Sequence, residues 1–199
     1  MRLASLCRGT SASLVLILFV VGLAAPAWAD DSRPIDAHHS HMTVFVSKSG
    51  IFSRFAHDHE IAAPLAAGTV DAGARSVELR VESRTLRVLD PDLAERKRSE
   101  VQRTMLGPKV LDVERFPEIR FRSTAIEKTG QESWSVRGTL ELHGQSRPVS
   151  LKVTRASESY RGSARLKQTD FGIKPVTVAG GTVRVKDEVR VEFEIALAR

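Results

Sequence analysis

Histidine is the residue type in this chain whose spacing first suggests chemistry. Five of the six histidines fall between His38 and His59. His39 and His41 are two residues apart, as are His57 and His59, so each pair would share one face of a strand. If the two strands are hairpin neighbours, four imidazoles could approach one another. Because neutral imidazole binds zinc, copper and nickel, His41, His57 and His59 are candidate ligands for a divalent metal.

Other interpretations of these histidines stay open. The four do not have a standard zinc-ligand spacing. They could instead donate hydrogen bonds to a ligand head group, end the strands, or pair with Asp36 and Asp58. His39 and His59 are therefore also candidate ligand-binding residues. His143 precedes Gly144 at an expected turn, where a structural role is expected.

Catalysis has little support in the sequence. Ser40 and Asp58 stand beside histidines, but adjacent residues on a strand point to opposite faces. No G-x-S-x-G elbow, H-E-x-x-H pair or Gly-rich phosphate loop accompanies them. We therefore expect a protein that is not an enzyme and that requires no cofactor.

Residues 1–29 have the parts of a cleavable secretory signal peptide. Arg2 and Arg8 give a basic start, residues 14–25 are apolar, and Ala27-Trp28-Ala29 is a small-residue cleavage site. The apolar run is short against the roughly 20 residues that span a bilayer. We expect cleavage after Ala29, a single mature domain of residues 30–199, no stable membrane span after cleavage, and a periplasmic or secreted location.

The remaining composition excludes further classes of site. Cys7 would leave with the signal peptide, so the mature domain would have neither disulfides nor cysteine-ligated zinc. The formal net charge of +6 is dispersed along the chain. The densest run, 95–98, begins with an acid and is typical of a solvated helix face. Nucleic-acid surfaces cluster basic and aromatic residues, so we expect no nucleic-acid partner.

Alternation of apolar and polar residues along the chain predicts that the candidate functional side chains lie mainly on strands. The last run shows it most plainly, with Val189, Val191 and Phe193 facing in and Arg190 and Glu192 facing out. The expected strands cover 39–48, 52–61, 69–71, 76–83, 118–127, 134–142, 147–155, 160–167 and 183–198, with one of the expected turns at residues 186–187.

One segment departs from this period. From Asp90-Pro91-Asp92 onward the pattern predicts one short charged helix, which Gly107-Pro108 ends. The helix lies in the crossover before Pro117 and either covers one end of the sheet or is a solvated connector.

Closing a sheet removes its exposed edges. We therefore expect an all-β fold, a single antiparallel barrel of about eight strands with one helix in a crossover, and a two-sheet sandwich as the alternative. A barrel of about this size has room for one elongated small ligand.

Ordered motifs cover nearly all of residues 30–199. They are the stretches 35–40, 112–124, 138–148, 170–173 and 187–193. In this order and spacing they resemble the YceI-like family, exported bacterial proteins with a lipocalin-like barrel. The resemblance implies an apolar channel that holds a polyisoprenoid or similar amphiphilic lipid, such as an isoprenoid quinone, without catalytic residues. It also makes a homodimer reasonable. The histidine-rich segment 55–60 departs from the family pattern.

Phenylalanines would supply wide apolar surfaces to such a channel, although plain core packing is the alternative for each. The candidate ligand-binding set is Phe45, Phe52, Phe55, Phe116, Phe121 and Phe171, with His39 and His59. The expected function is to bind a lipid for transport, storage or stress protection. The alternative is a periplasmic metal-binding protein that uses His39, His41, His57 and His59.

Overall fold

The computed structural model describes residues 32–49, 58–73, 75–178 and 183–198. Within them lie one α-helix, α1 (Glu95–Leu106), and the short 3₁₀ turns η2 (Ser83–Thr85) and η3 (Gln168–Phe171). The strands are β1 (Ser32–Ser49), β2 (His59–Ala62), β3 (Leu65–Asp71), β4 (Ser76–Glu82), β5 (Arg87–Val88), β6 (Glu118–Gly130), β7 (Ser133–Leu142), β8 (Gln145–Ala156), β9 (Ser159–Lys167), β10 (Thr177–Val178) and β11 (Val183–Leu197).

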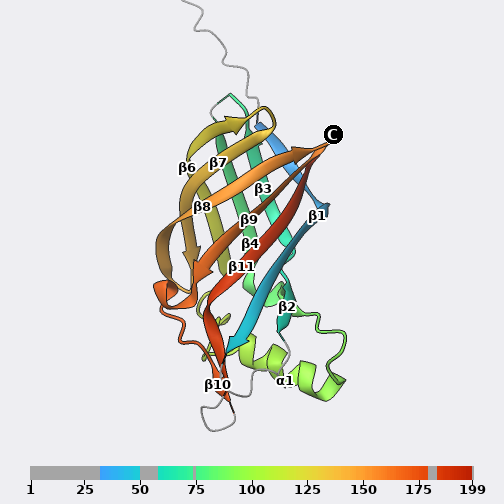
Figure 1. Ribbon diagram of the computed structural model, residues 1–199, viewed down its shortest axis with the longest axis vertical. Helices are drawn as coiled ribbons and strands as arrows, with labels where there is room; N and C mark the ends of the chain where they lie inside the picture. The colour runs from blue at the N-terminus through green and yellow to red at the C-terminus, as the bar shows by residue number, and fades with distance from the viewer. Residues whose placement is uncertain (1–31, 50–57, 74, 179–182, 199) are drawn as a thin grey trace, which may run out of the picture.

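Eight of these strands close into an antiparallel barrel (Figure 1). Around the barrel the order is β1, β3, β4, β6, β7, β8, β9 and β11, and β11 pairs back onto β1. The short strand β2 pairs with the last part of β1 and with β5, while β10 pairs with β11. The predicted barrel with one helix is confirmed, and the sandwich alternative is wrong because β1 and β11 join the two edges.

The period-two pattern places the apolar side chains inside. In β11, Val189 is buried and packs in the core, whereas its neighbour Arg190 is exposed. The turn expected at Lys186-Asp187 is wrong, because β11 runs through these residues without a break. The Asp187 side chain instead accepts hydrogen bonds from Thr169, so this acid binds η3 rather than forming a turn.

Helix α1 lies across one end of the barrel (Figure 1). It ends before Gly107, as the sequence predicts, but begins at Glu95 because residues 91–93 form a turn and a bend. Met105 is 6% exposed and packs in the core. Gln102 accepts a hydrogen bond from Val88 N (2.8 Å) and donates one to Leu86 O (2.8 Å). The helix therefore covers the barrel end and is not a solvated connector.

The opposite half of the barrel is filled by side chains. Ile35, Val136 and Ile195 are each buried there, and Trp134 packs edge-on against Tyr160 with 5.9 Å between ring centroids. Across the residues that the structure describes, none of the helices combines the length and apolar character that crossing a membrane requires. The predicted signal peptide, residues 1–29, lies outside the described residues.

Candidate functional site

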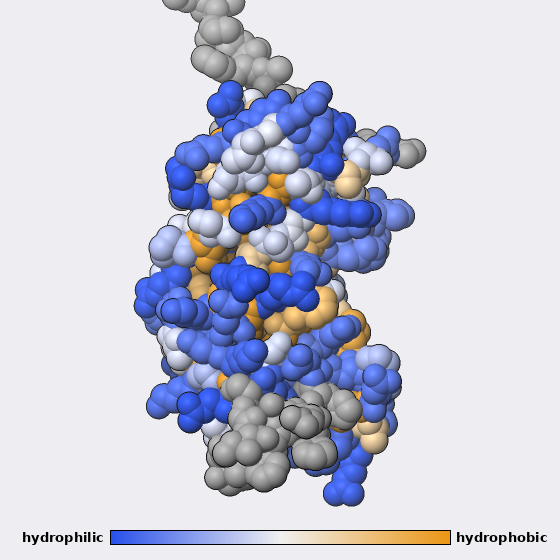
Figure 2. All heavy atoms as spheres, viewed as in Figure 1, coloured by the Kyte–Doolittle hydropathy of each residue, from blue (hydrophilic) through white to orange (hydrophobic). Residues whose placement is uncertain are grey.

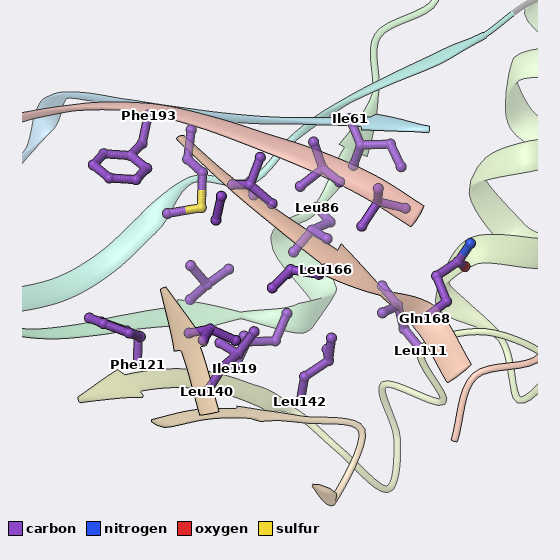
Figure 3. A pocket seen from close by; sticks show the side chains of 18 of the residues that line it. Ile61, Leu86, Leu111, Ile119, Phe121, Leu140, Leu142, Leu166, Gln168 and Phe193 are labelled. Carbon is purple, nitrogen blue, oxygen red and sulfur yellow. The ribbon is translucent and has the colours of Figure 1, made fainter. Parts of the chain in front are cut away.

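The half of the barrel nearer to α1 encloses a cavity of about 190 Å³ (Figure 3). Its lining comes from the inner faces of seven barrel strands, completed by Ile61 of β2 and by Met105 of α1. Among the described lining residues only Gln168 is polar. Its side-chain nitrogen donates to Lys186 O (2.8 Å). The cavity therefore offers an almost wholly apolar surface to whatever occupies it.

Two aromatic rings lie at the end of this cavity away from Leu111 and Gln168 (Figure 3). Phe121 packs over Gly138, and Phe193 packs over Gly162, its partner across the β9–β11 pair. A β-carbon at either glycine would overlap the ring above it. The two glycines thus allow these rings to lie close against the barrel wall.

One predicted phenylalanine, Phe121, lines the cavity. Phe45 does not, because it alternates with inward-facing Val44 and its ring lies under the Arg190 guanidinium on the outer face, 4.3 Å from carbon to centroid. Phe171 is 1% exposed and packs in the core at the end of η3, away from the cavity lining. Phe116 stacks at a tilt on His143, with centroids 4.6 Å apart. None of these three residues lines the cavity, so the expectation that they form its wall is wrong.

Phe52 and Phe55 lie outside the described residues, so their role in ligand binding stays a prediction. The predicted set omitted the aliphatic lining, such as Met42, Leu140 and Leu166. Strand alternation could have identified these residues, since each stands on the same face as other apolar residues of its strand.

The structure separates two of the predicted metal ligands. His41 is opposite Glu194 on the outer face of β1, whereas His59 is opposite inward-facing Val46. The expectation that these two imidazoles approach one another is therefore wrong. The described residues contain no group of three or more His, Cys, Asp or Glu side chains that could hold a metal ion. His57 lies outside the described residues.

His59 takes part in a buried polar contact instead. Its Nδ1 lies 2.5 Å from Asp90 Oδ2, and the two side chains are 13% and 3% exposed. The other Asp90 oxygen accepts the Glu60 N–H (2.9 Å). Nearby, burial lowers the pKa of the Lys48 ammonium, while Asp90 and Asp58 act in the opposite direction. This contact joins β2 to the segment that leads into α1, and His59 does not line the cavity.

His39 has a local structural role, in line with the alternative that the histidines pair with Asp36 and Asp58. Asp36 accepts the backbone N–H groups of His38 and His39, and its second oxygen lies 2.7 Å from His39 Nδ1. The hydrogen bond from His39 holds the pKa of the Asp36 carboxyl below its usual value. These contacts lie in the irregular part of β1, between Asp36 and His41, and His39 does not line the cavity.

His143 is structural, as expected from its place in the sequence. It has a φ of 51° in the turn between β7 and β8. Its Nδ1 lies 3.1 Å from Phe171 O, so the ring fixes η3 against this turn.

Comparison with known proteins agrees with the fold. The chain matches the YceI-like domain over residues 34–197. It is 38% identical over 74 residues to UPF0312 proteins of Pseudomonas savastanoi pv. phaseolicola and Pseudomonas putida strain W619. Each match covers 32% of this chain and only 38% of the relative's length. The crystal structure of Burkholderia cenocepacia BcnA superposes with a TM-score of 0.60 at 18% identity, covering 83% of this chain and 99% of that one, which shows a shared fold. Since the domain match spans the whole barrel, the chain belongs to the YceI-like family.

Proposed function

We propose that this protein binds an amphiphilic lipid of the polyisoprenoid type, such as an isoprenoid quinone, with the lipid chain inside the barrel. The family and the barrel fold are both consistent with a binding protein. The observation that supports the lipid is the cavity itself, whose described lining is apolar from Met42 to Phe193 except at Gln168. An apolar chain is the ligand class that such a lining favours.

The physical basis of affinity would be chain burial. Moving one CH₂ group from water into an apolar site contributes roughly 0.8 kcal/mol before the costs of ordering. Each isoprenoid unit that enters the cavity would add to the affinity at that rate, so the buried part of the chain needs no strong polar anchor. Binding would require no cofactor and no catalytic residue, and the ligand would be held for transport, storage or stress protection.

The proposal includes export to the periplasm or beyond, on the basis of the signal-peptide pattern in residues 1–29. Edman sequencing of the native protein would give Asp30 as its first residue if cleavage follows Ala29.

Native purification tests the lipid proposal directly. The protein is purified gently from its own envelope extract, extracted with organic solvent, and the extract is analysed by mass spectrometry. We expect one class of long-chain lipid in an amount close to equimolar. Repeated absence of any such lipid would count against the proposal.

Two matched variants then place the lipid. Val44 lines the cavity, whereas the adjacent Thr43 faces outward opposite Glu192. Val44→Phe puts a larger side chain into the cavity and should remove the copurifying lipid, while Thr43→Phe should retain it. Equal retention by two folded variants would place the lipid elsewhere.

A further inference from the structure

The barrel wall is incomplete between β8 and β9. These strands pair only between residues 152–156 and residues 159–163. The remainder of β8, 145–151, pairs with β7 on its other side, and residues 164–167 of β9 pair with β11. Figure 1 shows the two strands close together at their connecting turn and apart toward η3. We call the gap between 145–151 and 164–167 the β8–β9 seam.

A proline lies on one side of this seam. Pro148 has no backbone N–H, so it cannot supply a donor to a strand beside it. Proline is tolerated on edge segments for this reason. The sequence therefore disfavours closing β8 against β9 at this level of the barrel.

A groove of about 610 Å³ lies over the seam on the outer surface. Val149, Ala164 and Leu166 border both this groove and the internal cavity. A single layer of side chains therefore separates the two spaces. Figure 2 shows apolar surface exposed between polar side chains on the face that carries these strands.

The groove differs from the cavity in charge. Its basic residues are Arg147, Lys152, Arg165 and Lys167, against the acids Asp170 and Glu188. Arg165 pairs with Glu188 at 2.9 Å. Arg147 donates to the backbone oxygen of Asp170 (2.8 Å) and not to its carboxylate. The groove lining therefore has an excess of positive charge, although Lys167 also interacts with the Asp187 carboxylate outside it.

Arg147 connects the groove to the cavity. It is opposite cavity-lining Leu140 in the β7–β8 register, so it stands on the inward-facing side of β8. Its side chain nevertheless borders the outer groove and reaches η3. A guanidinium thus lies beside the layer of side chains that a chain in the cavity would have to pass to reach solvent.

We infer that the β8–β9 seam holds an acidic head group, a carboxylate or a phosphate monoester, at the end of the bound chain. The inference rests on the proposed function and narrows it, because a neutral quinone head would leave the excess positive charge unmatched. The chain would pass between Val149 and Leu166 into the cavity. A guanidinium fork and two lysines suit either anion.

Ligands of equal chain length test the assignment. Delipidated protein is titrated with hexadecanoic acid, hexadecyl phosphate and hexadecanol. We expect the two anions to bind more tightly than the alcohol, with a difference that shrinks as salt is added. The anion that binds with the higher affinity indicates which head-group chemistry the seam favours.

A pair of double variants locates the head group. Lys152→Gln with Lys167→Gln removes charge at the seam, whereas Arg103→Gln with Lys109→Gln removes equal charge at the α1 end of the barrel. Exposed charges contribute only modestly each, so we expect the seam variant to bind the anions about three- to tenfold more weakly. Its affinity for hexadecanol should not change, and the α1-end variant should behave like the wild type.

The outcomes separate the two proposals. If the anions and the alcohol bind equally, or if only the α1-end variant loses anion affinity, the head group does not lie at the seam and chain binding stands. If none of the three ligands binds and no lipid copurifies with the native protein, the proposed function itself is wrong.

Discussion

Asp90 is nearly inaccessible to solvent and accepts hydrogen bonds that few other side chains could replace. It contacts His59 Nδ1 and the Glu60 N–H, both on β2. A buried donor left without its acceptor costs about 1–3 kcal/mol. A single carboxylate therefore determines how β2 joins the segment before α1.

We expect Asp90→Ala to lower the free energy of unfolding by about 2–4 kcal/mol, because it leaves both partners unsatisfied. Urea denaturation followed by circular dichroism measures the loss. Asp92→Ala, at an exposed position two residues away, should change stability by less than about 0.5 kcal/mol. Similar losses in the two variants would contradict this role for Asp90.

The Asp187 side chain makes a pH-dependent contribution to the stability of the fold. The Thr169 hydroxyl donates to it (2.7 Å), and this hydrogen bond is the main cause that holds the pKa of Asp187 below its usual value. A carboxylate with a lowered pKa stabilises the fold above its unfolded pKa, near about 4, and loses that contribution as pH falls through the folded value. The fold should therefore lose stability from this contact only in acid.

Asp187→Asn should accordingly be less stable than the wild type at pH 7, and the difference should shrink as the pH is lowered to 3 and below. Urea denaturation at both pH values tests the sign. A difference that is the same at both, or that grows in acid, would show that the charge of Asp187 is not involved.

Helix α1 is attached to the barrel by packing and by one amide side chain. Gln102 takes the place of a neighbouring strand for β5, since it accepts from Val88 N and donates to Leu86 O. Met105 of the same helix lines the cavity. The helix thus satisfies backbone groups at a strand edge while it closes the apolar space.

Gln102→Ala should lower the free energy of unfolding by about 1–3 kcal/mol, because the Val88 N–H and Leu86 carbonyl lose their partner. Hydrogen exchange at the Val88 amide should become faster. Arg103→Ala, on the exposed side of the helix, is the matched control and should leave exchange at Val88 unchanged. Unchanged exchange in Gln102→Ala would show that this pairing contributes little.

The elements show which parts of the structure local sequence could predict. Alternation predicts the faces of β11 and also places Phe45 outside, since Val44 faces in. His41 and His59 lie on different faces of the sheet because of the β1–β2 register. A long-range pairing fixes this register, and a shift of one residue would reverse the face of His59. The role of Asp187 was hidden for the same reason, because its partner Thr169 is distant in sequence.

The whole barrel is closed by its first and last described strands, with Ile35 opposite Leu197. Such a fold depends on contacts between residues far apart in sequence, which form slowly. It also encloses the cavity only when the ring is complete. Stability and ligand binding are therefore coupled at the level of the whole molecule.

Ligand should stabilise the folded barrel by mass action. With free hexadecanoic acid at about 100 times its Kd, the free energy of unfolding should rise by about 2.7 kcal/mol. Thermal denaturation of delipidated protein with and without the ligand measures this rise. Val44→Phe should show little of it, whereas Thr43→Phe should respond like the wild type. Equal responses would indicate binding outside the cavity.

The rings of Phe121 and Phe193 have a further consequence under the proposed function. They lie across the barrel above two glycines, with the filled half of the core behind them. A chain that enters through the β8–β9 seam must stop at these rings, so the space in front of them limits how many carbons fit. The barrel would then select its ligands by chain length, and the two aromatic side chains would set the maximum length.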